Sequence, residues 1–372
     1  MIKTKNLYFD TAATTPLDLR VADHMHQINK DIYGNPSSIH QTGQKAHNII
    51  ERSRKKIAEL LNCKQSEIYF TSGGSESNNI ALRGILNSGD HLITASYEHP
   101  AILDVAKYLE SINIEVTYVK PNSDGIVKAK DIKKAIKSNT KLVSIMAVNN
   151  EIGTINPINK ISDMCKEHGI YFHTDAVQYI GKKEINLDLS SIDMLSLGAH
   201  KFYGPKGIGA IYIKSGIVIN PFIFGGGQEK GIRPGTESPS LISGMCHALE
   251  IAIKDLEKNS MHINDMENLF LELLDKTKIK YNVNGSPRLK GIINITFFDY
   301  DGHSLLLNLD MKNIAISFGS ACASGSAKAS STLLSIGLKE EIANKTVRIS
   351  IGKQITDKNI RYLVDTLKEI IH

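Results

Sequence analysis

Short apolar runs alternate with segments of helical periodicity from about residue 43 to residue 255, and this alternation constrains the fold more than any other feature. The runs that predict buried strands are 91–96, 114–119, 141–148, 170–175 and 193–198. Helical spacing fills stretches such as 129–139 and 158–169, the second of which ends on Gly169, as a C-cap would. Repeated strand–helix–strand order predicts a mostly parallel sheet with helices on both faces. A further run at 207–214, after a glycine-rich turn, predicts an edge strand.

The pattern changes after about residue 256. A charged helical stretch is followed by the apolar run "GIINITF", an apolar helix near 303–309, the β-like run "TVRISIG" and a terminal helix. This order is typical of an α+β unit. We therefore expect an α/β fold with a large domain at 15–255 and a smaller α+β domain made of 1–14 and 256–372. A length of 372 residues is compatible with two domains.

The charge balance argues against nucleic acid as a direct partner. Lysine and arginine number 44 against 39 aspartate and glutamate residues, for a net charge of +5, and the basic residues are scattered among acidic ones. Nucleic-acid surfaces gather basic and aromatic residues instead. No run is long enough to span a membrane, and the N-terminus lacks the apolar stretch of a signal peptide. We expect a cytoplasmic protein without a membrane partner.

Four cysteines lie far apart and form no CxxC pair, which argues against a zinc site or a disulfide framework. Cys63, Cys165 and Cys246 lie in or beside helical patterns, where packing is their ordinary role. Cys322 differs, because it stands in "GSACASGSA", among glycine, serine and alanine. Such a segment is typical of a loop rather than of a core. This thiol is therefore a candidate for chemistry.

The segment "YFTSGGSESNN" at 69–79 predicts a phosphate site. A short strand leads into a Gly-Gly turn, and a helix then opens at Ser75 with Glu76 in its first turn. Glycine lets the backbone approach an anion, and the N–H groups at a helix start carry partial positive charge. A phosphate would lie against Gly74 and Ser75. The alternative is an ordinary capped turn.

A lysine and an aspartate stand at the ends of two neighbouring predicted strands. Lys201 follows "SLGAH" and precedes a turn rich in glycine and proline, and Asp175 ends "YFHTD", 26 residues earlier. Open α/β sheets bind ligands at the carboxyl ends of their strands. Pyridoxal phosphate needs a lysine for its aldehyde and a carboxylate for its pyridine nitrogen. Together with the phosphate site, this pair favours a role for Lys201 in binding pyridoxal phosphate over the alternative that Lys201 is an ordinary solvated lysine.

Ten segments along the chain, taken in order, resemble the signature segments of the NifS/IscS-type cysteine desulfurases, which are fold-type I pyridoxal-phosphate enzymes of the class V aminotransferase group. The resemblance extends from Tyr8 to Gly352. The segments are "YFDTAATTP", "GNPSSIHQTG", "TSGGSESNN", "EHPAI", "VNNEIGTINPI", "FHTDAVQ", "AHKFYGPKGIGA", "GGGQEKGIRPGTE", "GSACASGS" and "VRISIG".

The resemblance implies a role for each matching residue around the cofactor ring. Lys201 would bind the aldehyde covalently, and Asp175 would pair with the pyridine nitrogen. Gln178 would donate a hydrogen bond to the ring hydroxyl. His99 would stack on the ring and transfer protons, although a histidine before Pro100 could alternatively serve only as a helix-entry residue.

The resemblance also implies residues for the phosphate and the substrate. Gly74, Ser75 and His200 would hold the phosphate, with Thr236 contributed by the other subunit of a homodimer. Asn150 would contact cofactor and substrate, and Arg348 would bind the substrate carboxylate with two hydrogen bonds. The alternatives from the residues alone are that Asn150 braces a turn and that Arg348 forms a surface ion pair.

The implied activity is the desulfuration of L-cysteine to L-alanine with a persulfide on Cys322. The sulfur would pass to an acceptor protein, such as an iron–sulfur scaffold, or towards tRNA thiolation, and an iron–sulfur contact through Cys322 during transfer is compatible with this role. No resident metal is expected. The alternatives are another class V enzyme, such as a selenocysteine lyase or an aminotransferase, and a non-catalytic sulfur-handling protein.

The chain departs from the family pattern at several positions. Gly198 stands where a serine commonly donates to the phosphate, so one hydrogen bond would be missing. Ser75 replaces a threonine and keeps its hydroxyl, and Thr11 replaces an asparagine. Beyond the cysteine, Ala329 and Ser331 stand where proline and histidine are usual. These last two bear on the conformation of the cysteine segment and on the choice of acceptor.

Overall fold

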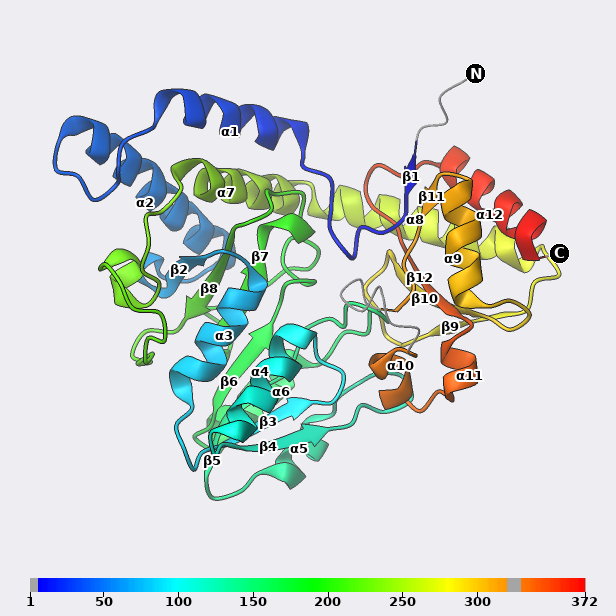
Figure 1. The fold of residues 1–372 in the computed structure, drawn as a ribbon, viewed down its shortest axis with the longest axis horizontal. Helices are drawn as coiled ribbons and strands as arrows, with labels where there is room; N and C mark the ends of the chain where they lie inside the picture. The colour runs from blue at the N-terminus through cyan, green and yellow to red at the C-terminus, as the bar shows by residue number, and fades with distance from the viewer. Residues whose placement is uncertain (1–5, 320–328, 372) are drawn as a thin grey trace.

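The computed structural model describes residues 6–319 and 329–371, so Cys322 lies outside the described residues. Two sheets with separate apolar cores dominate this part of the chain, and the long helix α8 (Leu256–Asp275) runs from beside the larger sheet to the smaller one (Figure 1). The α/β fold class with a smaller α+β part is confirmed. The domain boundaries at residues 15 and 256 remain a prediction.

The larger sheet has seven strands in the order β2-β8-β7-β6-β5-β3-β4. All pairs from β7 to β4 are parallel, whereas β8 is antiparallel to both of its neighbours. The strands are β2 (Ile68–Thr71), β3 (His91–Ala95), β4 (Glu115–Val119), β5 (Thr140–Ser144), β6 (Tyr171–Asp175), β7 (Met194–Gly198) and β8 (Gly209–Ile213).

The expectation of an edge strand at 207–214 is wrong in its position. The strand forms as β8, but it lies between β7 and β2, and β2 takes the edge. The physical reason is burial: every residue of β8 is buried, which suits a strand paired on both sides.

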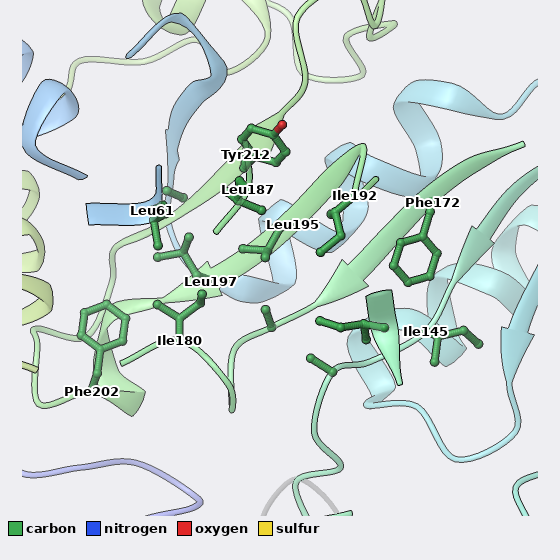
Figure 2. Close-up of a cluster of buried hydrophobic side chains, with 14 of the residues drawn as sticks. Leu61, Ile145, Phe172, Ile180, Leu187, Ile192, Leu195, Leu197, Phe202 and Tyr212 are labelled. Atoms are coloured by element: carbon green, nitrogen blue, oxygen red, sulfur yellow. The ribbon is translucent and has the colours of Figure 1, made fainter. Parts of the chain in front are cut away.

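Helices cover both faces of the larger sheet. Successive residues of β3 illustrate the two faces, because Leu92 packs with the apolar side chains of α3 and α4, whereas Ile93 belongs to the cluster with α2, α6 and α7. Figure 2 shows part of the second cluster, including Phe172, Leu195 and Leu197. The helices are α1 (Leu19–Asp31), α2 (Gln41–Leu61), α3 (Gly74–Ile85), α4 (Pro100–Ser111), α5 (Ala129–Ala135), α6 (Ile158–Glu167) and α7 (Pro239–Lys254).

The smaller sheet is antiparallel, in the order β12-β10-β9, and a separate parallel pair joins β1 to β11. Its apolar core includes Phe9, Phe270 and Phe297. The remaining elements are β1 (Leu7–Tyr8), β9 (Tyr281–Asn284), β10 (Ile292–Phe297), α9 (Gly302–Met311), β11 (Ile314–Ala315), α10 (Ser331–Ser335), α11 (Glu340–Ala343), β12 (Thr346–Ser350) and α12 (Asp357–Ile371). Across the described ranges, none of the helices has the length and apolar character needed to cross a membrane.

The segment after β1 connects the smaller sheet to the end of β7. Phe9 O accepts from Ser350 N at 2.7 Å, and Ala12 N donates to Ser350 Oγ at 2.9 Å. A few residues later, Thr15 N donates to the carbonyl oxygen of His200 at 2.9 Å. The first turn of the chain is thereby fixed between the two sheets, next to the predicted site.

Candidate active site

The structure places Asp175 and Lys201 at one edge of the larger sheet. β6 ends at Asp175, which pairs in register with Ser196 of the parallel strand β7. β7 ends at Gly198 and continues into the short 3₁₀ helix η2 (Ala199–Lys201). Carboxyl ends of parallel strands meet at the same edge, where α/β proteins bind their ligands.

Lys201 and Gln178 converge on a single backbone oxygen. Lys201 Nζ donates to the carbonyl oxygens of Ala12 and Ala13 at 2.6 and 2.7 Å. Gln178 Nε2 donates to the same Ala12 oxygen at 2.8 Å. The lysine amine and the glutamine amide therefore lie within hydrogen-bond reach of one atom.

Asp175 is held as an acceptor by α3. Its side chain is buried, with the residue 7% exposed, and its Oδ2 accepts from Asn78 Nδ2 at 2.7 Å, while its Oδ1 accepts from Val177 N at 3.0 Å. Sequence reasoning did not single out Asn78. The signal was its spacing, because it follows Gly74 by four residues and so lies one helical turn further along the same face.

His99 does serve as a helix-entry residue, and it also belongs to the site. Its Nδ1 accepts from Ala101 N at 3.1 Å at the start of α4, so a neutral ring carries its proton on Nε2. Burial lowers the pKa of His99, the negative charge of Asp175 raises it, and the positive charge of Lys201 lowers it. The imidazole thus interacts electrostatically with both groups and is neutral near pH 7.

The Gly-Gly turn and the start of α3 adjoin His200, as the predicted cradle for an anion requires. Gly73 has φ +155°, and α3 begins at Gly74, one residue before the predicted start. A Cβ placed on Gly198 would lie 3.5 Å from Gly74 N and 3.6 Å from His200 Cδ2, so these three residues adjoin one another. The first N–H groups of a helix have no partner within the helix and can bind an anion. Ser75 is exposed beside them.

His200 enters this cradle in its neutral form. Burial, with the nearby charge of Lys201, lowers the pKa of His200 to about 4. Its Nδ1 lies 3.1 Å from Thr14 Oγ1. A neutral imidazole keeps one N–H, which can donate to a phosphate oxygen without adding a charge.

Arg348 is buried rather than on the surface, and the structure brings it to Asn150. The residue is 1% exposed; its Nη1 donates to the carbonyl oxygen of Asn150 at 2.8 Å and its Nη2 to Asp10 Oδ1 at 2.6 Å. Its Nε is buried and lacks a hydrogen-bond partner within the ranges that the structure describes. A guanidinium with two fixed ends and a spare donor suits a substrate carboxylate.

One predicted site residue among those described is not brought into this group. Thr236 is exposed on the segment between η3 (Gln228–Gly231) and α7, and among the described residues no hydrogen bond joins it to the residues above. Cys322 lies outside the described residues.

Sequence reasoning also missed a lysine and a glutamate next to the site. Lys182 Nζ donates to Gln178 Oε1 at 2.8 Å, and burial, with the charges of Lys201 and Arg348, lowers the pKa of Lys182 to about 7. Glu98 precedes His99; its Oε1 accepts from Met146 N at 2.8 Å, and burial raises the pKa of its carboxyl well above the ordinary value. The resemblance gave neither residue a role.

The residues present fit pyridoxal phosphate. The cradle at Gly74 supplies donors for a phosphate, Asp175 supplies an acceptor for a ring nitrogen, and Lys201 supplies an amine. An α/β fold with this donor set at its strand ends defines a class of aminotransferase-like enzymes. The class-V aminotransferase family model matches residues 7–363.

Similar proteins narrow the assignment. A cysteine desulfurase IscS of Dictyoglomus turgidum is 43% identical over 99% of this chain and 95% of its own length. A solved structure of a NifS-like protein is 34% identical, covers 98% of this chain and 99% of its own, and has a TM-score of 0.92. A structure of SspA in complex with cysteine is 39% identical over 94% of this chain and all of its own, with a TM-score of 0.84. The chain belongs to the class-V aminotransferase family, within its group of IscS- and NifS-type cysteine desulfurases.

Proposed function

We propose that this protein is a pyridoxal-phosphate-dependent cysteine desulfurase, which converts L-cysteine to L-alanine and keeps the sulfur as a persulfide on Cys322. The observation that carries the proposal is the convergence of Lys201 and Gln178 on the Ala12 carbonyl, beside Asp175 and His99. Relatives across the whole chain are named cysteine desulfurases, which supports the same activity.

The chain's own residues would hold the cofactor at both ends. Gly74, Ser75 and His200 would bind its phosphate, and Asp175 would bind its ring nitrogen. When bound, pyridoxal phosphate supplies an electron sink that stabilises negative charge at the substrate α-carbon. Asn78 keeps the Asp175 carboxylate oriented through the 2.7 Å hydrogen bond to Oδ2.

Two residues are suited to moving protons in this site. The Lys201 amine lies against backbone carbonyls, from which it can be released as a base once it is neutral. His99 is neutral and presents Nε2–H, because its Nδ1 is engaged by Ala101 N. Both residues are half-buried, and Lys201 lines a cavity that a substrate can enter.

Arg348 would orient L-cysteine by its carboxylate. Asp10 and the Asn150 carbonyl fix the guanidinium, and its buried Nε–H has no hydrogen-bond partner among the described residues. A fixed guanidinium loses little conformational entropy when it binds a carboxylate.

The sulfur-transfer step balances without an external oxidant. The Cys322 thiolate attacks the substrate Sγ, so a sulfur–sulfur bond forms and the substrate Cβ–Sγ bond breaks. The electron pair of that bond stays with the substrate carbon, which takes up a proton and becomes the methyl group of alanine. The carbon is reduced, and the two sulfur atoms share the oxidation.

The outer sulfur of the persulfide would pass to an acceptor protein, such as an iron–sulfur scaffold, or to the machinery of tRNA thiolation. We also propose a homodimer, in which the exposed Thr236 of one subunit completes the phosphate site of the other. The proposed location is the cytoplasm, where thiols stay reduced.

The test is to incubate the cofactor-loaded protein with L-cysteine and to measure alanine and sulfide. We expect equal amounts of both in the presence of a thiol reductant, with no alanine from Lys201→Ala or Cys322→Ala. Alanine that persists in Cys322→Ala would refute the persulfide route. Transfer of the amino group to a keto acid would instead favour an aminotransferase, and a strong preference for L-selenocysteine would favour a lyase.

A further inference from the structure

A buried carboxylate, Glu151, lies in the turn between β5 and α6 and is not needed for cofactor binding. The residue is 5% exposed. Asn149 holds this turn rigid, because its Oδ1 accepts from Glu151 N at 2.9 Å and from Ile152 N at 3.0 Å. The direction of the Glu151 side chain is therefore set by the backbone of the turn.

Both carboxylate oxygens of Glu151 accept hydrogen bonds from the start of α10. Ser330 Oγ donates to Oε2 at 2.5 Å, and Thr332 Oγ1 donates to Oε1 at 2.9 Å. Within the described ranges no cation pairs with Glu151. A buried carboxylate is costly unless it is hydrogen-bonded, so these two hydroxyls are what makes the burial tolerable. The start of α10 is thus held firmly on the turn.

The same turn contacts the arginine proposed to bind the substrate. Asn150, adjacent to Glu151, accepts from Arg348 Nη1 at 2.8 Å. The hydroxyl of Ser330 and the guanidinium of Arg348 are therefore bound by two consecutive residues of a rigid turn. Ser330 is thus bound to the residue that follows the backbone partner of Arg348.

The chain that precedes the Cys322 segment is tied to the same arginine. Ser317 exchanges two backbone hydrogen bonds with Arg348, one from Ser317 N at 3.0 Å and one to Ser317 O at 2.7 Å. The described residues on both sides of 320–328 are therefore connected to Arg348. Ser317 bonds to Arg348 directly, whereas Ser330 and Thr332 bond to Glu151, the residue after the arginine's partner Asn150.

We propose that Glu151 is a positioning residue for sulfur transfer: its carboxylate binds Ser330 and Thr332 and so fixes one end of the Cys322 segment relative to the substrate arginine. This inference rests on the proposed function. It requires that loss of the two hydrogen bonds slows the attack of Cys322 without weakening the binding of L-cysteine, since Arg348 keeps its own partners. A merely structural role would instead lower stability and affect both steps together.

The experiment uses the cofactor-loaded protein with the substitutions Thr332→Val and Ser330→Ala, alone and together. Thr332→Val keeps the shape of the side chain and removes its donor, and Ser330→Ala removes the other donor together with the helix cap that Ser330 gives to Leu333 N. Ser335→Ala is the matched control, because Ser335 lies in the same helix and its hydroxyl donates to the carbonyl oxygen of Ser96 rather than to Glu151. Single-turnover alanine formation and KM for L-cysteine are measured.

For the double variant we expect alanine formation to slow by about tenfold or more, while KM changes by less than about twofold, because misplacing a reacting group acts on the chemical step. The single variant Thr332→Val should show part of the loss, and Ser335→Ala should show none. Glu151→Gln, which keeps one carbonyl oxygen as acceptor, should fall between Thr332→Val and the double variant.

Unchanged alanine formation in the double variant would overturn the proposal. A rise in KM that accompanies a fall in both turnover and melting temperature would also overturn it, because a merely structural role predicts that result. Failure of the proposed function itself has a different signature, which is alanine formed by Cys322→Ala. If wild type forms alanine and Cys322→Ala does not, the result for Glu151 stands on its own.

Discussion

Restoring a serine at position 198 should tighten cofactor binding. Gly198 has φ −136° and ψ 127°, an extended conformation that any residue adopts. A Cβ there would meet Gly74 N at 3.5 Å, His200 Cδ2 at 3.6 Å and Val177 Cγ1 at 3.8 Å, all ordinary van der Waals distances. The serine Cβ would therefore fit without displacing a neighbour, with its hydroxyl next to the predicted anion cradle.

The expected gain follows from one charge-assisted hydrogen bond. Such a bond contributes about 1.5–3 kcal/mol. Since about 1.4 kcal/mol corresponds to a tenfold change in affinity, Gly198→Ser should lower the Kd for pyridoxal phosphate by roughly 10- to 100-fold. The measurement is a titration of cofactor-free protein with pyridoxal phosphate, followed by the absorbance of the bound cofactor.

Gly198→Ala is the matched control, because it adds the same Cβ without the hydroxyl. Both variants should gain about 0.5–1 kcal/mol in unfolding free energy from replacing a glycine in extended chain. Only the serine variant should bind the cofactor more tightly. If Gly198→Ala tightens binding equally, or if Gly198→Ser weakens it, the phosphate does not lie at Gly74 and the reasoning is refuted.

Three further predictions concern buried groups. Burial lowers the pKa of His173 from 6.5 to about 3, so the unfolded chain binds one more proton than the folded chain between these pH values. The unfolding free energy should therefore fall by about 1.4 kcal/mol for each pH unit below 6.5. For His173→Gln, the slope of unfolding free energy against pH should be smaller by one proton, and a slope equal to that of the wild type would contradict this. The pKa of Glu98 is raised by burial, so the unfolding free energy of the wild type should fall as the pH increases above the ordinary pKa of a glutamate. The unfolding free energy of Glu98→Gln should therefore increase relative to that of the wild type between about pH 5 and pH 8. A constant difference would argue against burial of the acid. Arg348→Lys should raise KM for L-cysteine by about tenfold or more, since lysine cannot replace a fixed fork of donors, and an unchanged KM would place the substrate carboxylate elsewhere.

The elements of the fold could be predicted because they depend on local pattern. The predicted strand at 91–96 is β3 at His91–Ala95, and the helix expected to end on Gly169 ends at Glu167, with His168 as its C-cap and Gly169 just beyond it at φ +67°. Strand order was not predictable in the same way. The position of β8 between β7 and β2 depends on pairing with a short strand far away in the sequence, which periodicity along one segment does not encode.

The site shows the same division between local and distant information. Asp175 and Lys201 could be placed together, because parallel strands bring their carboxyl ends to one edge. The partners that orient the site could not be found: Asn78 contacts Asp175 across 97 positions, and Glu151 contacts Ser330 across 179. No local sequence pattern indicates that a carboxylate in one turn will contact a hydroxyl so far along the chain.

The position of the first turn has a consequence for how this protein is made. Ala12 bonds to Ser350, 338 positions later, and its carbonyl receives the lysine amine. A ribosome releases residue 12 long before residue 350 emerges from the exit tunnel, so the nascent chain lacks the partners that the smaller sheet gives to that turn. We infer that the larger sheet can form during translation, whereas competence to take up the cofactor is acquired only at the end of synthesis, when the early residues find their late partners.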